Sequence, residues 1–117
     1  MEKSSIKYSI VLVPFPFDDF SQTKLRPAIC LSDEIGDFKH IILGFITSNV
    51  SLDDIETDVF LDIKLNKETG LQKDSIIRLH KLMSIPKNII KRKLGSLPKE
   101  LKNELDYKIS ILFKLKK

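Results

Sequence analysis

The sequence has too few cysteines, histidines and clustered glycines for several common kinds of active site. One cysteine and two histidines stand far apart in 117 residues, whereas a structural zinc site needs about four such ligands. The four glycines occur singly, so there is no glycine-rich loop to cradle the phosphates of a nucleotide. No Gly-x-Ser-x-Gly elbow presents a serine nucleophile. Metal chemistry and nucleotide hydrolysis are therefore disfavoured, and we expect no metal and no cofactor.

Long apolar runs are also missing. No run approaches the roughly 20 residues that span a bilayer, and the first residues lack the apolar core of a signal peptide. We therefore expect a cytoplasmic protein with no membrane segment. The single Cys30 lies inside an apolar run, which favours a small core residue over a nucleophile. The length and the ordinary globular composition predict one domain over residues 1–117.

The charge is unevenly distributed between the two halves of the chain. Residues 1–62 carry five Lys/Arg and eleven Asp/Glu, a net charge of −6, while residues 63–117 carry fifteen and five, a net charge of +10. A basic half suits a phosphate backbone, although scattered lysines are more often simply a solubilising surface. Charge alone is weak support for a nucleic-acid partner.

The N-terminal quarter reads as strand, long polar loop and strand. Residues 10–17 are IVLVPFPF, and their apolar start without alternation is typical of a strand covered on both faces. We expect this strand at about 7–13, ended by Pro14 and Pro16, which cannot donate to a ladder. After the loop, a second strand is expected at 28–31, entered through Arg26 and Pro27.

The remaining elements are predicted from periodicity. A turn at Gly36 should precede a strand over 40–47, in which Gly44 marks a bulge or a close backbone approach. Further strands are expected at 55–63, where clean alternation indicates an edge, at 75–85 and at 89–94. A helix should follow, with Ser96 as N-cap and one apolar stripe formed by Leu97, Leu101, Leu105, Ile109 and Leu112. The predicted fold is mainly β, a small β-barrel with a C-terminal α-helix packed on it.

The chemistry that remains open depends on polar side chains at strand ends, namely Arg26, Thr47, Ser48, Arg78 and His80. Such a set suits RNA transesterification, in which the substrate's own 2′-hydroxyl attacks the adjacent phosphate and no metal is required. Arginine can hold phosphate oxygens, and histidine can move a proton. Each residue also has a purely structural interpretation: Arg26 as a solvated strand-entry residue, Arg78 as a partner for the acidic strand, His80 as a half-buried polar group.

Five segments in the right order give the chain a family resemblance. They are residues 10–17, 24–32 (KLRPAICLS), 46–48 (ITS), 70–82 (GLQKDSIIRLHKL) and 93–97 (KLGSL). Together they resemble the PemK/MazF toxin endoribonucleases of type II toxin-antitoxin systems. The resemblance implies an SH3-like barrel of the CcdB/PemK/MazF type, usually a homodimer. It also implies metal-independent, sequence-specific cleavage of single-stranded RNA, restrained by a cognate antitoxin.

The resemblance also suggests which residues act. Arg26 and Thr47 match the catalytic arginine and threonine of the family, and Arg78 matches an arginine that some members use for phosphate stabilisation or proton donation. Where many members have an aspartate two residues after that arginine, this chain has His80, so a histidine is a candidate general base. Alternation along the strand should place His80 on the same face as Arg78. RNA contacts are expected from Phe17, Asp18, Lys24, Ser48 and Asn49.

A second departure precedes the first strand, where the family commonly has Gly-Asp and this chain has Tyr8 and Ser9. We expect this change to affect the turn more than the chemistry. The alternative function keeps the fold and changes the activity: a CcdB-type gyrase-poisoning toxin, or a non-catalytic SH3-like binding module. Arg26 and Thr47 together favour the ribonuclease.

Overall fold

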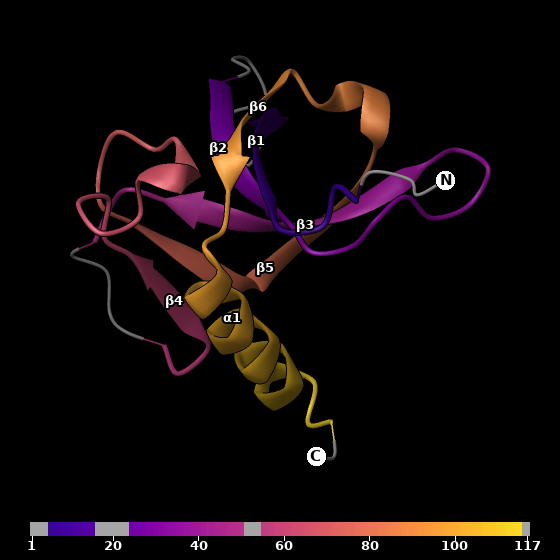
Figure 1. The fold of residues 1–117 in the computed structure, drawn as a ribbon. Helices are drawn as coiled ribbons and strands as arrows, with labels where there is room; N and C mark the ends of the chain where they lie inside the picture. The colour runs from indigo at the N-terminus through magenta and orange to yellow at the C-terminus, as the bar shows by residue number, and fades with distance from the viewer. Residues whose placement is uncertain (1–4, 16–23, 51–54, 116–117) are drawn as a thin grey trace.

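A computed structural model describes residues 5–15, 24–50 and 55–115 (Figure 1). It contains, in chain order, β1 (Ser9–Phe15), β2 (Lys24–Cys30), β3 (His40–Thr47), β4 (Asp58–Leu61), a 3₁₀ turn η1 (Lys67–Thr69), β5 (Ser75–Pro86), a 3₁₀ turn η2 (Lys87–Ile89), β6 (Arg92–Ser96) and α1 (Lys99–Leu112). The six strands form one antiparallel sheet in the order β4-β5-β3-β2-β1-β6. The mainly β fold with a C-terminal helix is therefore confirmed.

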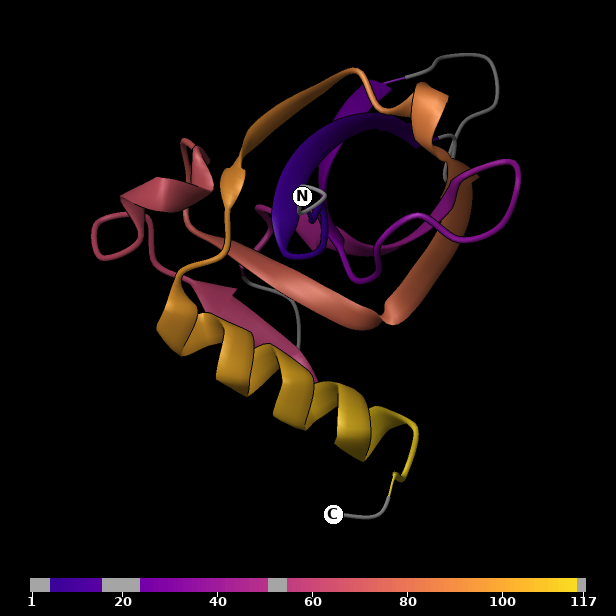
Figure 2. The same cartoon turned by 45° about the vertical axis from the view of Figure 1, so that its right-hand side comes forward.

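The sheet curls into a half-barrel, and α1 lies outside it beside β4 and β5 (Figure 2). Because the sheet is apolar on both faces, it buries two separate cores. The inner core gathers buried side chains of β1, β2, β3 and β5, among them Val11, Ala28 and Leu43. The outer core lies between the opposite face and the helix, and it includes Ile10, Ile29, Ile46, Ile77 and Leu105. The prediction that β1 is covered on both faces is confirmed.

Cys30 belongs to the inner core and is fully buried, as predicted. Burial disfavours the thiolate and raises the pKa of this thiol to about 12. The thiol is therefore protonated at neutral pH and packs as a small apolar side chain.

The helix packs on the barrel through the predicted stripe. Leu105 is buried in the outer core, and Leu101, Ile109 and Leu112 pack against the same cluster. The predicted start of the helix was wrong, however. Ser96 is the last residue of β6, where it pairs with Ser9, and Pro98 occupies the N-cap. Within the described ranges, no helix is both long and apolar enough to cross a membrane.

Two prolines lie inside strands that we expected them to interrupt. β1 continues through Pro14, and β2 begins at Lys24 and includes Pro27, so both strands run further toward their shared loop than predicted. The pairing explains why. β1 pairs with β6 only as far as Leu12, and β2 pairs with β3 only from Ala28, so each proline has a neighbouring strand on one side alone. A missing N–H on the open side breaks no ladder bond.

The predicted strand at 55–63 is shortened at both ends by aspartate side chains. At its start, the amide of Ile55 donates to Asp58 Oδ2 and the amide of Asp58 donates to the carbonyl of Ile55, which makes a turn. At its end, Asp62 Oδ1 accepts from the amide of Lys64. β4 therefore spans Asp58–Leu61 and forms one edge of the sheet, as its alternation predicted. The short basic strand expected at 89–94 begins instead at Arg92, after η2.

β5 bends in the middle of its pairing with β3. Phe45 pairs with Arg78 and the preceding Gly44 pairs with Leu82, so three residues of β5, Leu79 to Lys81, have no partner on β3. A Cβ on Gly44 would lie 3.1 Å from Ile29 Cγ2. The bulge and the close approach expected at Gly44 are therefore both present.

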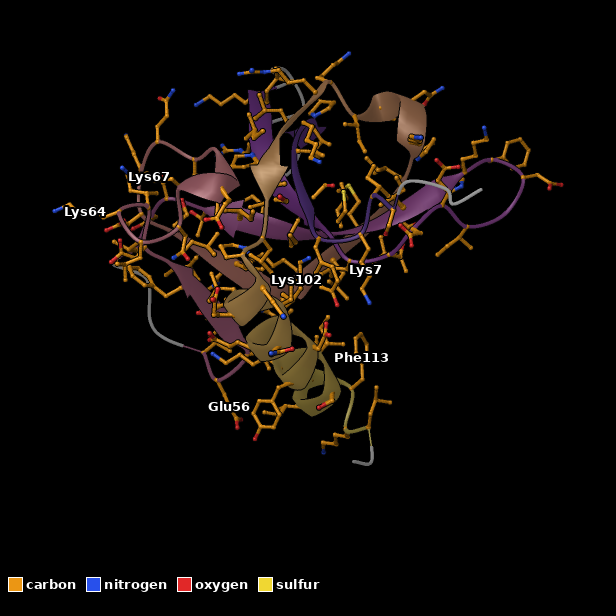
Figure 3. The ribbon with its side chains drawn as sticks, in the orientation of Figure 1. Lys7, Glu56, Lys64, Lys67, Lys102 and Phe113 are labelled. Carbon is orange, nitrogen blue, oxygen red and sulfur yellow. The ribbon has the colours of Figure 1, made fainter. Side chains whose placement is uncertain are left out.

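Tyr8 stands where the family commonly has glycine, and it takes a backbone conformation that favours glycine. Its φ is +73°, in the left-handed region. Its phenol donates to the carboxylate of Asp106 on α1, 2.8 Å from Oδ2, and the Lys7 and Lys102 ammonium groups lie 5.0 and 5.1 Å from the ring centroid. Figure 3 shows these two lysines close together where the helix meets the barrel. Tyr8 thus ties α1 to the start of β1 at the expense of backbone strain.

Replacing Tyr8 by phenylalanine should lower the free energy of unfolding by about 1 kcal/mol, because the bond to Asp106 is lost. Burial, the bond to Asp106 and its negative charge raise the pKa of the Tyr8 phenol from 10.0 to about 12. The folded state therefore holds this proton more tightly than the unfolded state, and the contribution should disappear as the pH rises from 10 to 12. Urea unfolding of wild type and Tyr8→Phe across this range measures the difference. Tyr107→Phe, at an exposed position of the same helix, is the control.

Candidate functional site

The strand register brings Arg26 and Thr47 to one rim of the half-barrel. Ala28 of β2 pairs with Phe45 of β3, and paired residues project from the same face. Arg26 and Thr47 each lie two positions beyond this pair in the same direction, so they share its face at adjoining strand ends. Both side chains are partly exposed. Two of the residues selected from sequence are therefore neighbours in space.

The same face continues across the sheet as a row at this rim. Thr47 pairs with Ile76 of β5, and Ile76 pairs with Phe60 of β4. On the other side, Arg26 pairs with Val13 of β1. This rim row, defined as Val13, Arg26, Thr47, Ile76 and Phe60, crosses five strands and carries an arginine and a hydroxyl at its centre.

The hydroxyl of Thr47 accepts a hydrogen bond and can still donate its proton. The amide of Asn49 donates to Thr47 Oγ1 at 3.1 Å, so the hydroxyl oxygen acts as the acceptor in a short local turn. A hydroxyl that already accepts one bond can still donate its proton to another group. Thr47 can therefore donate to an anionic oxygen placed over the rim.

Arg78 lies one row deeper and pairs with an aspartate. Its Nη1 is 3.0 Å from Asp58 Oδ2, and each side chain is 10% exposed. Arg78 and Asp58 are also register partners on β5 and β4. The interpretation of Arg78 as a partner for the acidic strand thus describes this contact. Arg78 remains on the face of the rim row, diagonal to Thr47, where its guanidinium can add positive potential.

His80 is in a different environment from Arg78. It is exposed and falls among the three residues of β5 that have no partner on β3. Arg78 pairs with Phe45, and Leu82 pairs with Gly44. Because Phe45 and Gly44 are adjacent in β3, they belong to opposite faces of the sheet. Regular alternation is therefore broken between Arg78 and Leu82. The argument that placed His80 beside Arg78 therefore does not hold.

The predicted RNA-contact residues fall into two groups. Lys24, Ser48 and Asn49 are exposed and adjoin the strand ends that carry Arg26 and Thr47. Phe17 and Asp18 lie outside the described residues. Within the described part of the chain, no group of three or more His, Cys, Asp or Glu side chains could hold a metal ion.

Two residues of this region were not selected from sequence. They are Asp58 and Phe60, which stand on the strand whose alternation indicated only an edge position. Residues two apart on a strand project from the same face, so Asp58 shares a face with Phe60, and Ile76 shares one with Arg78. The two strands pair at Asp58 and Arg78, which puts all four side chains on one face. Without that register, the sequence could not place them on one face.

The comparisons with known proteins agree with this fold. The toxin MazF-mt6 of Mycobacterium tuberculosis is similar in structure, with 22% identity and a TM-score of 0.73 over 93% of this chain and 99% of that one. An endoribonuclease solved with its cognate antitoxin from a mycobacterial species has 10% identity and a TM-score of 0.73, over 97% of this chain and 99% of that one. The MazE-MazF structure of Deinococcus radiodurans has 16% identity and a TM-score of 0.64, over 98% of this chain and 100% of that one. No curated protein matches by sequence.

At these identities the structural likeness establishes the fold, which is that of the small half-barrel toxins. The family follows from the sequence itself. The profile of the PemK-like, MazF-like toxins of type II toxin-antitoxin systems matches residues 7–113, and this chain belongs to that family.

The buried ion pair provides a test of the site's architecture. Arg78→Gln and Asp58→Asn should each lower the free energy of unfolding by about 3 kcal/mol, because each breaks the buried ion pair between the two side chains. The double variant should cost clearly less than the sum of the two. Urea denaturation of the four proteins completes the cycle. Additive losses would mean that the two side chains do not depend on each other.

Proposed function

We propose that this toxin is a metal-independent endoribonuclease that cleaves single-stranded RNA at specific sequences and so inhibits translation and growth. The observation that carries the proposal is the position of Arg26 and Thr47 side by side on one rim of the half-barrel. Membership of the family and the likeness to an endoribonuclease solved with its antitoxin support it.

The chemistry requires few groups. The 2′-hydroxyl of the substrate attacks the adjacent phosphorus and the bond to the 5′-oxygen of the next nucleotide breaks. That oxygen takes up a proton from water or from an acid in the site, and a cyclic phosphate and a 5′-hydroxyl result. Arg26 holds two non-bridging oxygens through its fork of N–H donors, and Thr47 donates to the same group. Arg78 adds positive charge from the next row. A general base takes the proton of the attacking hydroxyl, and His80 is one candidate.

The proposal includes two protein partners. One is a cognate antitoxin that blocks the RNA site, supported by the likeness to toxins solved together with theirs. The other is a second copy of the chain. An apolar hollow of about 210 Å³ lies between the helix and the outer face of the sheet, lined by Leu31, Ile42, Leu79, Leu82, Ile109, Leu112 and Phe113. Exposed apolar surface of this kind commonly marks a protein contact and supports a homodimer.

Arg26→Ala and Thr47→Ala should each reduce RNA cleavage by at least about 100-fold, the size of effect seen when a donor to a developing anion is removed. The fold should be unchanged, because both side chains are partly exposed at a rim. Cleavage of a long single-stranded RNA in EDTA, read by primer extension, gives the rates. Arg92→Ala, at an exposed arginine on the far edge of the sheet, is the control. Wild-type rates for Arg26→Ala would remove Arg26 from the site.

The role of His80 can be separated from that of the rim residues by pH. If His80 is the general base, the cleavage rate should rise with pH across the range in which an imidazole loses its proton, and His80→Asp should move that rise to lower pH. Rates of wild type, His80→Ala and His80→Asp between pH 5 and 9 make the comparison. An unchanged rate and profile for His80→Ala would exclude His80 as the base.

A further inference from the structure

A tight turn leads into β1, and one carboxylate from a distant segment holds it. The amide of Ser9 donates to the carbonyl of Ile6 at 2.9 Å, which closes this N-terminal turn from Ile6 to Ser9. Asp33, in the connection between β2 and β3, accepts at Oδ1 from the amide of Ile6 at 2.8 Å and from that of Lys7 at 3.0 Å. The hydroxyl of Ser5 donates to the same oxygen at 2.8 Å. Three donors from the start of the chain therefore converge on one atom of Asp33.

These donors stabilise the charged form of Asp33. The amide of Lys7 and the hydroxyl of Ser5 hold the pKa of this carboxyl below its ordinary value. Asp33 itself is exposed, and within the described residues it makes no hydrogen bond or ion pair with α1. Its contacts therefore fix the N-terminal turn without touching the helix.

Tyr8 is the third residue of this turn, and its positive φ is that of a type II turn. Glycine is preferred at such a position, so the conformation of Tyr8 is strained and persists only while its surroundings hold it. The amide of Tyr8 donates to the carbonyl of Cys30 at 2.7 Å, and its carbonyl accepts from the amide of Leu97 at 2.9 Å. The bonds that end at Asp33 hold the other half of the turn.

The strained conformation is also the one that brings the Tyr8 side chain to the helix. The phenol lies 2.9 and 2.8 Å from the two carboxylate oxygens of Asp106, and the Lys102 ammonium is 5.1 Å from the ring centroid. The ring packs against the outer core as well. Relaxation of Tyr8 to a negative φ would redirect its side chain away from these partners. The attachment of α1 through Tyr8 therefore depends on the turn.

The two separate cores allow the helix to open as a unit of its own. The outer core lies under α1, whereas the inner core and the apolar side chains packed against it include no described residue of α1. Figure 2 shows α1 outside the curl of the sheet. Loss of the helix therefore leaves the inner core and the strand pairing in place, and such a partial opening requires less free energy than complete unfolding.

We propose that Asp33 controls how firmly α1 is attached to the sheet, by holding the N-terminal turn in the conformation from which Tyr8 reaches Asp106. When Asp33 loses its bonds to the turn, Tyr8 relaxes and α1 detaches more often, while the strands and the inner core stay folded. Because Ile109 and Leu112 of the helix line the apolar hollow, the same contact keeps that hollow in shape. This device belongs to the fold and does not depend on RNA cleavage.

Amide hydrogen exchange of the full chain, read by mass spectrometry at one fixed protein concentration, tests the proposal. In wild type, the amides of α1 should exchange before those of β3, because the helix opens without the sheet. Asp33→Ala should speed exchange in α1 on the order of tenfold, the effect of losing about one hydrogen bond from its attachment. Asp33→Asn keeps an acceptor oxygen and should give a smaller increase. Asp37→Ala, at an exposed aspartate of the same connection, is the matched control and should exchange as wild type does.

Tyr8→Ala separates the proposed route from a general loss of stability. It should speed exchange in α1 at least as much as Asp33→Ala does, because the contact with Asp106 is gone. In the Tyr8→Ala protein, Asp33→Ala should then add no further increase in α1. Circular dichroism checks the fold of each variant. If Tyr8→Ala does not fold, Tyr8→Phe replaces it, and the increase that Asp33→Ala adds should be smaller than in wild type.

Three results would overturn the proposal. Equal exchange of α1 and β3 in wild type means that the helix does not open separately. Wild-type exchange of α1 in Asp33→Ala means that the N-terminal turn does not control the helix. An undiminished effect of Asp33→Ala in the Tyr8 variant means that Asp33 acts by a route other than Tyr8. None of these measurements uses RNA, so each result leaves the proposed ribonuclease activity as it stands.

Discussion

β5 pairs with both β3 and β4 through Ile76, Ile77 and Arg78, and with β3 alone from Leu82 onward. The three unpaired residues between these two parts allow the strand to turn, and the whole sheet curls with it (Figure 1). The first part supplies the rim beside Thr47 and supports the short β4. The second part closes the inner core through Met83 and Ile85. Both cores and the candidate site therefore depend on this one irregular pairing.

The outer core needs the helix, and polar contacts fix where the helix lies. Tyr8 reaches Asp106 near the middle of α1, and Lys108 reaches the carbonyl of Asp58 at the edge of β4. These contacts connect the helix to the start of β1, next to the edge strand β6, and to β4 at the opposite edge of a sheet whose outer face is apolar. The apolar stripe provides most of the burial, whereas the tyrosine and the lysine determine its direction and register.

Much of the fold followed from pattern. The boundaries of β3, the bend at Gly44, the edge position of β4 and the helical stripe were predicted, because each depends on residues within one segment. The errors came from pairing between segments. Pro14 is tolerated because β1 has one neighbour there, and strict alternation from Arg78 to His80 cannot be assumed because β3 opposes β5 irregularly. Asp58 comes next to the candidate site only when the register sets it against Arg78, which no single-strand pattern can indicate.

The single cysteine gives the toxin a built-in chemical reporter. Alkylating and disulfide-exchanging reagents require an accessible thiolate, and Cys30 in the folded half-barrel has neither exposure nor the charged form, since its pKa is about 12. Reagent can therefore consume the thiol only while the inner core is open. With no second cysteine to confuse the signal, the labelling rate records how often the barrel opens in buffer, in lysate or beneath a bound partner.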